Sequence, residues 1–273
     1  TIDGSTGTDV VITADASSND TLVAGTFITD VAASLAADAT SLNDNSRVIN
    51  FTAVSGDLTL NSLTVTGGRT TGFHERGGGI QFLSAGVVTV AQGAISGNSS
   101  SDDGGGISTG TGSVALTGST VSGNQSGKYG GGIFSISGGV TLTSSTVSGN
   151  QSGSEGGGIF TFEGGVTLTG STVSGNSSSS HGGGISNFKG SVTLASSTVS
   201  GNSSNRNGGG IYSDDSTVLI TSSTITGNTA GGVGGGVGLL ADNYNDNERW
   251  WDLLDRSTEC FRLAHPQQLR NGK

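Results

Sequence analysis

A triple glycine followed by an aliphatic residue recurs along this 273-residue chain at an almost constant spacing. The aliphatic residue falls at Ile80, Ile107, Ile133, Ile159, Ile185, Ile211 and Val237, so the first step is 27 residues and the next five are 26. An asparagine recurs with the same period, at Asn98, Asn124, Asn150, Asn176, Asn202 and Asn228. A fixed period of about 20–50 residues is the signature of stacked repeats, in which each unit packs only against its neighbours. The sequence therefore predicts a solenoid.

Each unit contains three short β-prone runs separated by turn-forming residues. In one central unit these runs cover residues 133–136, 140–143 and 146–148. Runs this short cannot form a stable hairpin sheet alone. If each run pairs with its copy one unit along, the copies form parallel sheets that rise about 4.8 Å per coil. We therefore expect an all-β fold, a parallel β-helix with three short strands per coil of about 26 residues.

Alternation along each run assigns its two faces, because successive side chains of a strand point to opposite sides. Ile133, Val140, Leu142, Val147 and their copies are expected to fill the bore of the β-helix. The glycine triplets are expected where the backbone turns with positive φ and where a Cβ would clash with the next coil.

The chain divides into three predicted parts. Residues 1–56 are expected to form an N-terminal cap with strand-like runs at 10–13, 26–28 and 48–51 and a short helix or ordered loop at 31–37. Residues 57–237 form the repeat array, with its first recognisable rung at Leu58. Residues 238–273 break the pattern, and the spacing of Trp250, Leu253, Leu254 and Phe261 predicts a capping helix. A foreign linker or an unstructured tail is the alternative for this last part.

Composition narrows the function classes. A net charge of −10, without a basic stripe, argues against nucleic acid and anionic membrane surfaces as partners. No apolar run of about 18 residues exists, so we expect no membrane-spanning helix. The three His residues are dispersed and Cys260 is single, so we expect no metal and no cofactor. The start at Thr1, without an initiator Met, is expected of a processed product or a fragment, and the composition favours a secreted or cell-surface protein.

The repeated Gly-Gly-Gly-Ile and Ser-Gly-Asn motifs resemble those of right-handed parallel β-helix repeat proteins of the pectin-lyase-like superfamily. Within it, residues 57–237 most resemble the passenger repeats of bacterial polymorphic outer-membrane proteins and autotransporter adhesins. The resemblance implies the fold. It leaves function open, because that superfamily contains lyases, hydrolases, adhesins and structural stalks.

The position before each glycine triplet varies, in contrast to the rest of the unit. It holds, in order, Arg76, Asp103, Tyr129, Glu155, His181, Asn207 and Val233. Stacked at the coil spacing, Asp103, Tyr129, Glu155 and His181 would form a strip of titratable side chains that could carry acid–base catalysis on a polysaccharide. Asp103 and Glu155 would be about 9–10 Å apart, two coils along. Unconstrained surface turns would look the same, so the strip makes catalysis an alternative only.

Two further columns could bind a ligand. Phe134, Phe160 and Tyr212 are expected in one outward column, where exposed rings near Tyr129 would stack on sugars. The alternative is that such a column turns inward or packs under a loop. Outward threonines such as Thr141, Thr167 and Thr193 resemble ice-binding arrays, although Ala115 and Leu219 interrupt them. The asparagine column is expected to be structural, a ladder of side-chain amides that hydrogen-bond from coil to coil.

Taken together, these features favour a secreted or bacterial cell-surface β-helix scaffold, an adhesin-like or structural passenger segment without catalytic activity. Its expected partners are cell-surface glycans or proteins of a host or neighbouring cell. A lyase or hydrolase of the pectin-lyase-like type is the first alternative, and an ice-binding protein is the second.

Overall fold

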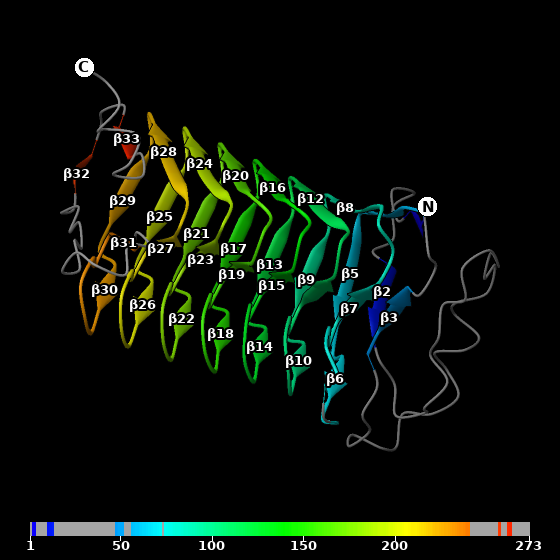
Figure 1. Cartoon of the computed structure of the whole chain (residues 1–273). Coiled ribbons are helices and arrows are strands. Elements are labelled where there is room, and N and C mark those ends of the chain that lie inside the picture. Colours follow the sequence, from blue (N-terminus) through cyan, green and yellow to red (C-terminus); the bar gives the residue numbers. More distant parts are fainter. Residues whose placement is uncertain are drawn as a thin grey trace.

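The computed structural model describes residues 2–3, 10–13, 47–51, 56–72, 74–240, 256–257 and 261–263. It is an all-β parallel solenoid of about seven turns, and no helix occurs among these residues. The coils stack along one axis, with the N-terminal strands at one end and the last strands at the other (Figure 1). The predicted fold class is confirmed.

Four sheets run along the solenoid, one more than predicted. Sheet A contains β1 (Ile2–Asp3), β4 (Leu58–Asn61), β8 (Val87–Ala91), β12 (Ser113–Thr117), β16 (Val140–Thr143), β20 (Val166–Thr169), β24 (Ser191–Ala195), β28 (Thr217–Thr221) and β33 (Phe261–Leu263). Sheet B contains β2 (Val10–Thr13), β5 (Leu63–Thr66), β9 (Ala94–Ser96), β13 (Thr120–Ser122), β17 (Thr146–Ser148), β21 (Thr172–Ser174), β25 (Thr198–Ser200), β29 (Thr224–Thr226) and β32 (Arg256–Ser257).

Sheets C and D complete each coil. Sheet C contains β3 (Ile49–Phe51), β7 (Ile80–Phe82), β11 (Ile107–Thr109), β15 (Ile133–Ser135), β19 (Ile159–Thr161), β23 (Ile185–Phe188), β27 (Ile211–Asp214) and β31 (Val237–Leu240). Sheet D contains β6 (Arg69–Thr70), β10 (Ser99–Ser100), β14 (Gln125–Ser126), β18 (Gln151–Ser152), β22 (Ser177–Ser178), β26 (Ser203–Ser204) and β30 (Thr229–Ala230). The strands of sheet D have two residues each and lie on the loops after the asparagines (Figure 1), without the apolar alternation that reveals the other three sheets.

The register follows the predicted period. Ile133 pairs with Ile159, Val140 with Val166 and Val147 with Val173, so like residues stack on like. Ile133, Val140, Leu142 and Val147 are fully buried, as are most of their copies. A one-residue slip would turn each of these side chains outward, and the constant repeat length prevents it.

The three glycines of a triplet have different reasons to be glycine. Gly130, the first, has a φ of 61°, in the region that glycine enters without cost. A Cβ on Gly131, the second, would lie 2.4 Å from the carbonyl oxygens of both Gln151 and Gly157 in the next coil. A Cβ on Gly132 would lie 2.7 Å from the carbonyl oxygen of Gly158. The triplet therefore combines a turn with a close approach between coils.

Two polar ladders hold adjacent coils together. In the first, the backbone N–H and the side-chain amide of Asn124 both donate to Oδ1 of Asn150, each at 2.9 Å, and the pattern repeats along the column. This confirms the predicted asparagine ladder. The second was not predicted: the backbone N–H of Ser119 donates to Oγ of Ser145 at 3.1 Å, and Ser145 donates in the same way to Ser171. Both ladders satisfy buried groups at turns.

The ends differ in part from expectation. The predicted runs at 10–13 and 48–51 appear as β2 and β3. β1 and β2 pair in parallel with β4 and β5, and β3 pairs with β7, so the stacked sheets extend to the N-terminal side of Leu58. Beyond the array, β33 and β32 pair antiparallel with β28 and β29. Phe261 is thus in a strand, not in the predicted helix. The rest of that helix, the run at 26–28 and the predicted helix or loop at 31–37 lie outside the described residues.

Candidate functional site

The variable residues of the repeat meet on the outer side of sheet C. In three successive coils, the loop before the glycine triplet places its last side chain against the outward residue of the next coil's sheet C strand. Glu155 contacts Ser186 in this way, and the two are 31 residues apart. The same separation joins Tyr129 to Phe160 and His181 to Tyr212. We call this surface, made of the loops and the outward residues of sheet C, the paired strip.

Aromatic rings fill the middle of the paired strip. The ring of Tyr129 lies 4.7 Å from that of Phe160, centroid to centroid, and Phe134 stacks on Phe160 at 5.6 Å with an interplanar angle of 8°. Phe188 continues the row to Tyr212 at 5.8 Å. Contacts of this kind add about 0.5–1.5 kcal/mol per pair beyond burial. The row is therefore a small second core outside the bore.

The predicted sugar platform of exposed rings is wrong. Phe134, Phe160 and Tyr212 do point away from the bore, but only 3–5% of each is exposed. The physical reason is the loop in front of them: Tyr129 covers Phe160, His181 covers Tyr212, and the guanidinium of Arg76 lies 5.2 Å over the ring of Phe134. The alternative, packing under a loop, is confirmed. Phe162, directly after β19, stacks on Phe188 with centroids 6.2 Å apart and is 39% exposed.

Glu155 occupies the gap that a small residue leaves in the aromatic column. Its partner Ser186 takes the place that Phe160 and Tyr212 have in adjacent coils, and Oγ of Ser186 donates to Oε2 of Glu155 at 3.0 Å. Burial raises the pKa of the Glu155 carboxyl to about 7, against the opposing effect of the hydrogen bond from Ser186; Asp214 raises the pKa further and Arg206 lowers it. The carboxyl therefore titrates near neutral pH.

Ion pairs close the N-terminal end of the paired strip. Nε of Arg76 lies 2.9 Å from Oδ2 of Asp103, and Nζ of Lys128 lies 2.6 Å from Oδ1 of Asp102. Both carboxylates are buried. Burial and the neighbouring Asp102 raise the pKa of Asp103, while Arg76 and Lys128 lower it. Paired and buried in this way, Asp103 holds Arg76 over the ring of Phe134.

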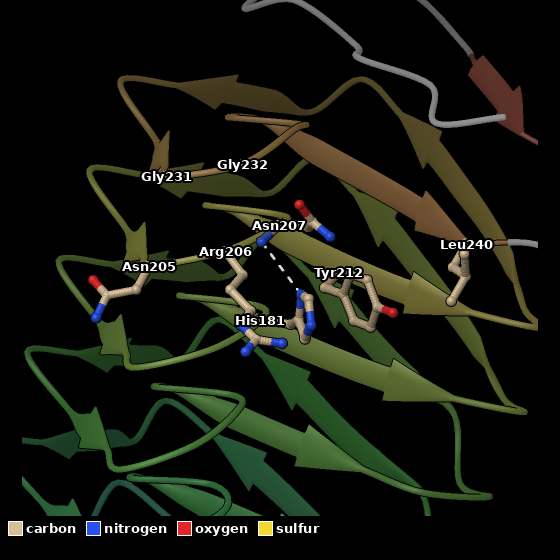
Figure 2. Close-up of a pocket in the computed structure, with 8 residues that line it drawn as sticks. All are labelled: His181, Asn205, Arg206, Asn207, Tyr212, Gly231, Gly232 and Leu240. Atoms are coloured by element: carbon tan, nitrogen blue, oxygen red, sulfur yellow. Dashed lines mark hydrogen bonds between the residues drawn. The ribbon is translucent and has the colours of Figure 1, made fainter. Parts of the chain in front are cut away.

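A hollow of about 430 Å³ opens at the other end of the paired strip (Figure 2). Its lining residues are His181, Asn205, Arg206, Asn207, Tyr212, Gly231, Gly232 and Leu240. Nδ1 of His181 accepts the backbone N–H of Asn207 at 3.2 Å. Burial lowers the pKa of His181, and the nearby Arg206 lowers it further, so the ring is neutral at pH 7.

The hollow exists because the repeat loses three side chains here. Gly231, Gly232 and Gly238 stand one coil beyond Asn205, Arg206 and Tyr212, at the same positions of the repeat. The partner of Asn207 at the same separation of 31 residues would be residue 238, and residue 238 is glycine. Among the described residues, the loop before β27 therefore has no ring or carboxyl to cover, and this space is not filled by the repeat.

The four predicted catalytic residues lie on successive coils, and their side chains have different partners. Asp103 is held by Arg76, Tyr129 packs in the aromatic row and Glu155 contacts Ser186. Of the four, His181 alone lines the hollow, together with Tyr212 from the predicted ligand-binding set. Arg206 and the glycines were not predicted as site residues. The sequence does show glycine at residues 231, 232 and 238. Only the strand register shows that these three glycines lie together and leave a hollow.

The predicted threonine columns lie on the outer side of sheet A. Thr141 pairs with Thr167, and Thr167 with Thr193, in parallel register. Ala115 and Leu219 stand at the two ends of this column, at the positions where the sequence places its interruptions.

Other kinds of site find little support in the described part of the chain. Within it, no three His, Cys, Asp or Glu residues gather to hold a metal ion. No helix among the described residues is long and apolar enough to cross a membrane.

Comparison with known proteins gives one family match. The model described as the Chlamydia polymorphic membrane protein (Chlamydia_PMP) repeat matches residues 196–214. That stretch runs from the turn before β25 to the end of β27 and includes Asn202, Arg206 and the glycine triplet before Ile211. Searches of curated proteins and of solved structures gave no match.

Proposed function

We propose that this chain, a β-helix repeat protein related to the polymorphic outer-membrane proteins, is a surface-displayed passenger segment that acts as an adhesin-like scaffold and recognises glycans along the paired strip. The repeat family points to a bacterial outer-membrane or surface location.

One observation carries the proposal: the variable side chains of an otherwise uniform repeat collect on one face. Sheet B repeats Thr, Val and Ser from coil to coil, and sheet A repeats Val, Thr and Leu. The paired strip instead changes from ion pairs to aromatic rings to an open, polar hollow. Recognition needs a surface on which neighbouring groups differ, and a uniform surface carries little specificity.

A scaffold role agrees with how the titratable residues of the paired strip are used. Asp103 and Glu155 each have a partner that holds the carboxyl in place, and neither lines the hollow. A general acid or base has to lie within hydrogen-bond reach of its substrate. The paired strip is therefore better suited to binding than to turnover.

The test is adhesion and glycan binding by the same protein. The purified chain is applied to a glycan array, and a bacterial strain that displays it is applied to cell monolayers with their glycans intact or enzymatically removed. We expect retention of glycans on the array and glycan-dependent adhesion. Adhesion that is unchanged after glycan removal, or saturable breakdown of a polysaccharide that is lost in Glu155→Gln or His181→Ala, would contradict the proposal. Thermal hysteresis that is lost when Thr167 is replaced by a bulky residue would support the ice-binding alternative instead.

A further inference from the structure

We propose that the hollow at His181, Arg206 and Asn207 binds a terminal sugar that carries a single carboxylate. This inference rests on the proposed glycan recognition and names the class of sugar and the part of the paired strip that holds it. It follows from the groups that face the hollow, from their hydrogen-bond partners and from the charge of the chain.

Arg206 supplies the charge. It is exposed on the loop before β27, and no hydrogen bond or ion pair of its side chain is found among the described residues. The other cations of the paired strip are engaged: Arg76 with Asp103, Lys128 with Asp102, and Lys189 over the ring of Phe162. A guanidinium without a hydrogen bond or ion pair among the described residues presents a planar fork of donors that fits a carboxylate with two parallel hydrogen bonds.

The neighbours of Arg206 are donors too. Nδ1 of His181 accepts from the backbone N–H of Asn207, so the proton of the neutral ring is on Nε2, which is left as a donor. Oδ1 of Asn207 accepts the backbone N–H of Val233 at 3.0 Å, which leaves the amide NH₂ of Asn207 as its free side. Figure 2 shows His181 and Arg206 side by side below Asn207. Three kinds of donor thus converge, and such a set selects an acceptor with negative charge.

The remaining walls suit a sugar ring. His181 stacks on Tyr212 with centroids 4.5 Å apart and an interplanar angle of 22°, and both residues line the hollow, where aromatic surface suits the C–H face of a sugar. Leu240 adds an apolar wall, and Asn205 adds an exposed amide. The volume of about 430 Å³ lies within the range of small-molecule sites, about 300–1,000 Å³.

The charge of the chain limits the ligand to one carboxylate. With a net charge of −10, the protein repels a polyanion, and the hollow offers a single arginine against it. A terminal sugar with one carboxylate gains the contact with Arg206 and brings little additional repulsion. A polyuronate chain brings a negative charge with every residue.

The experiment measures binding of two small glycans that differ in one acidic sugar. Sialyllactose and lactose are titrated separately into the full chain and into three variants, followed by calorimetry or by ligand-observed magnetic resonance. Arg206→Gln removes the charge. Asn207→Asp keeps the acceptor for Val233 and replaces the amide donor with a carboxylate. Arg69→Gln is the matched control, since Arg69 is an exposed arginine on β6, near the opposite end of the solenoid.

We expect sialyllactose to bind the full chain and Arg69→Gln alike, and at least tenfold more tightly than lactose. Arg206→Gln and Asn207→Asp should each weaken sialyllactose binding at least tenfold, with unchanged circular dichroism and melting temperature. Binding should also weaken as salt is added, because the contact is between charges.

Each contrary result has a distinct meaning. Equal binding of both sugars, or an unaffected Arg206→Gln variant, would overturn the carboxylate site and leave glycan recognition standing. Tighter binding of polygalacturonate than of sialyllactose would overturn the limit to one carboxylate. Equal binding of a short peptide with a free C-terminal carboxylate would overturn the assignment to a sugar. Adhesion that is independent of glycans would remove the proposed function itself.

Discussion

Oγ of Ser186 donates a hydrogen bond to Oε2 of Glu155 at 3.0 Å, across 31 residues and one coil of the solenoid. Tyr129 and Phe160 stand in the same relation, as do His181 and Tyr212. The residue types match within each pair: a carboxylate with a hydroxyl, or an aromatic ring with another ring. These three variable positions are therefore not independent loop tips, because each is coupled to the strand residue that it covers.

Replacing Glu155 with glutamine should stabilise the protein at alkaline pH. The pKa of Glu155 rises from 4.5 when unfolded to about 7 when folded, so the folded state binds its proton more tightly. The stability that this proton gives is complete below pH 4.5 and is lost as the pH rises through 7. Since one unit corresponds to about 1.4 kcal/mol, the loss is between about 1 and 3 kcal/mol once the partial exposure of Glu155 is allowed for.

Thermal melting at pH 5 and pH 8 measures this effect. Glu155→Gln should melt at a higher temperature than the parent protein at pH 8, and the difference should shrink markedly at pH 5. Glu163→Gln, which changes an exposed glutamate in the same coil, is the control and should alter melting little at either pH. A Glu155→Gln variant that is destabilised equally at both pH values would contradict the assignment.

Tyr129 and Phe160 should show a coupling energy in a double-mutant cycle. Their rings lie 4.7 Å apart, and Phe160 is 95% buried, since only 5% of it is exposed. Phe160→Ala should cost about 3 kcal/mol or more of stability, as large-to-small changes in a core do. The double variant should be less destabilised than the sum of the single variants by about 0.5–1.5 kcal/mol, the worth of an aromatic pair.

Urea unfolding of the parent, the two single variants and the double variant supplies the cycle. Phe162→Ala provides the comparison, because its ring is 39% exposed and its loss should cost well below that of Phe160. Strict additivity of Tyr129→Ala and Phe160→Ala would show that the two rings do not support one another.

The glycines of the triplet that face the next coil should not tolerate a larger residue. Gly131→Ala would place its Cβ 2.4 Å from two carbonyl oxygens of that coil, and backbone atoms have no room to give way. Gly139→Ala is the matched control in the same coil. There the nearest atom to a new Cβ is the carbonyl oxygen of Gly165 at 3.5 Å, an ordinary contact, and φ is not positive.

The soluble expression and the melting temperature of the two variants test this prediction. We expect Gly131→Ala to lower the melting temperature strongly or to prevent folding. Gly139→Ala should be neutral or slightly stabilising, because alanine restricts the unfolded chain. Equal effects of the two substitutions would mean that the glycine triplet is not set by contact between coils.

The period predicted the fold because the residues that repeat are also the residues that contact their equivalents in the adjacent coil. Ile133 meets Ile159 and Asn124 meets Asn150, so a repeat at 26 residues is also a list of contacts. Sheet D went unnoticed because a pair such as Gln125–Ser126 has no apolar alternation, although its N–H and C=O groups pair like those of longer strands.

The site was harder to predict because its side-chain contacts join residues 31 apart in the sequence, whereas the repeat period is 26 residues. Alternation correctly turned Phe160 away from the bore, but it could not show that Tyr129, 31 residues earlier, lies over it. The hollow is harder still, since it arises where Gly232 and Gly238 replace side chains. An absent side chain becomes a signal only after the register is known.

The asparagine ladder should be weakest at its end and strongest in its middle. Oδ1 of Asn150 accepts two hydrogen bonds from Asn124, and its amide donates to Val121 and to Asn176, with all four groups buried. Asn150→Ala leaves the backbone N–H of Asn124 without a partner and removes one of the two acceptors of its amide, and each unsatisfied buried group costs about 1–3 kcal/mol. We expect a total loss of roughly 3 kcal/mol or more.

Asn228→Ala is the matched control, at the C-terminal end of the ladder. Asn228 also accepts two hydrogen bonds from Asn202, at 2.9 Å each, but it is only half-buried, and its amide has the Val199 carbonyl as its described acceptor. Water can replace a lost partner at such a site. In urea unfolding, Asn150→Ala should therefore lose at least twice the stability that Asn228→Ala loses. Equal losses would mean that the backbone pairing of sheets A to D holds the coils together, with little contribution from the amide column.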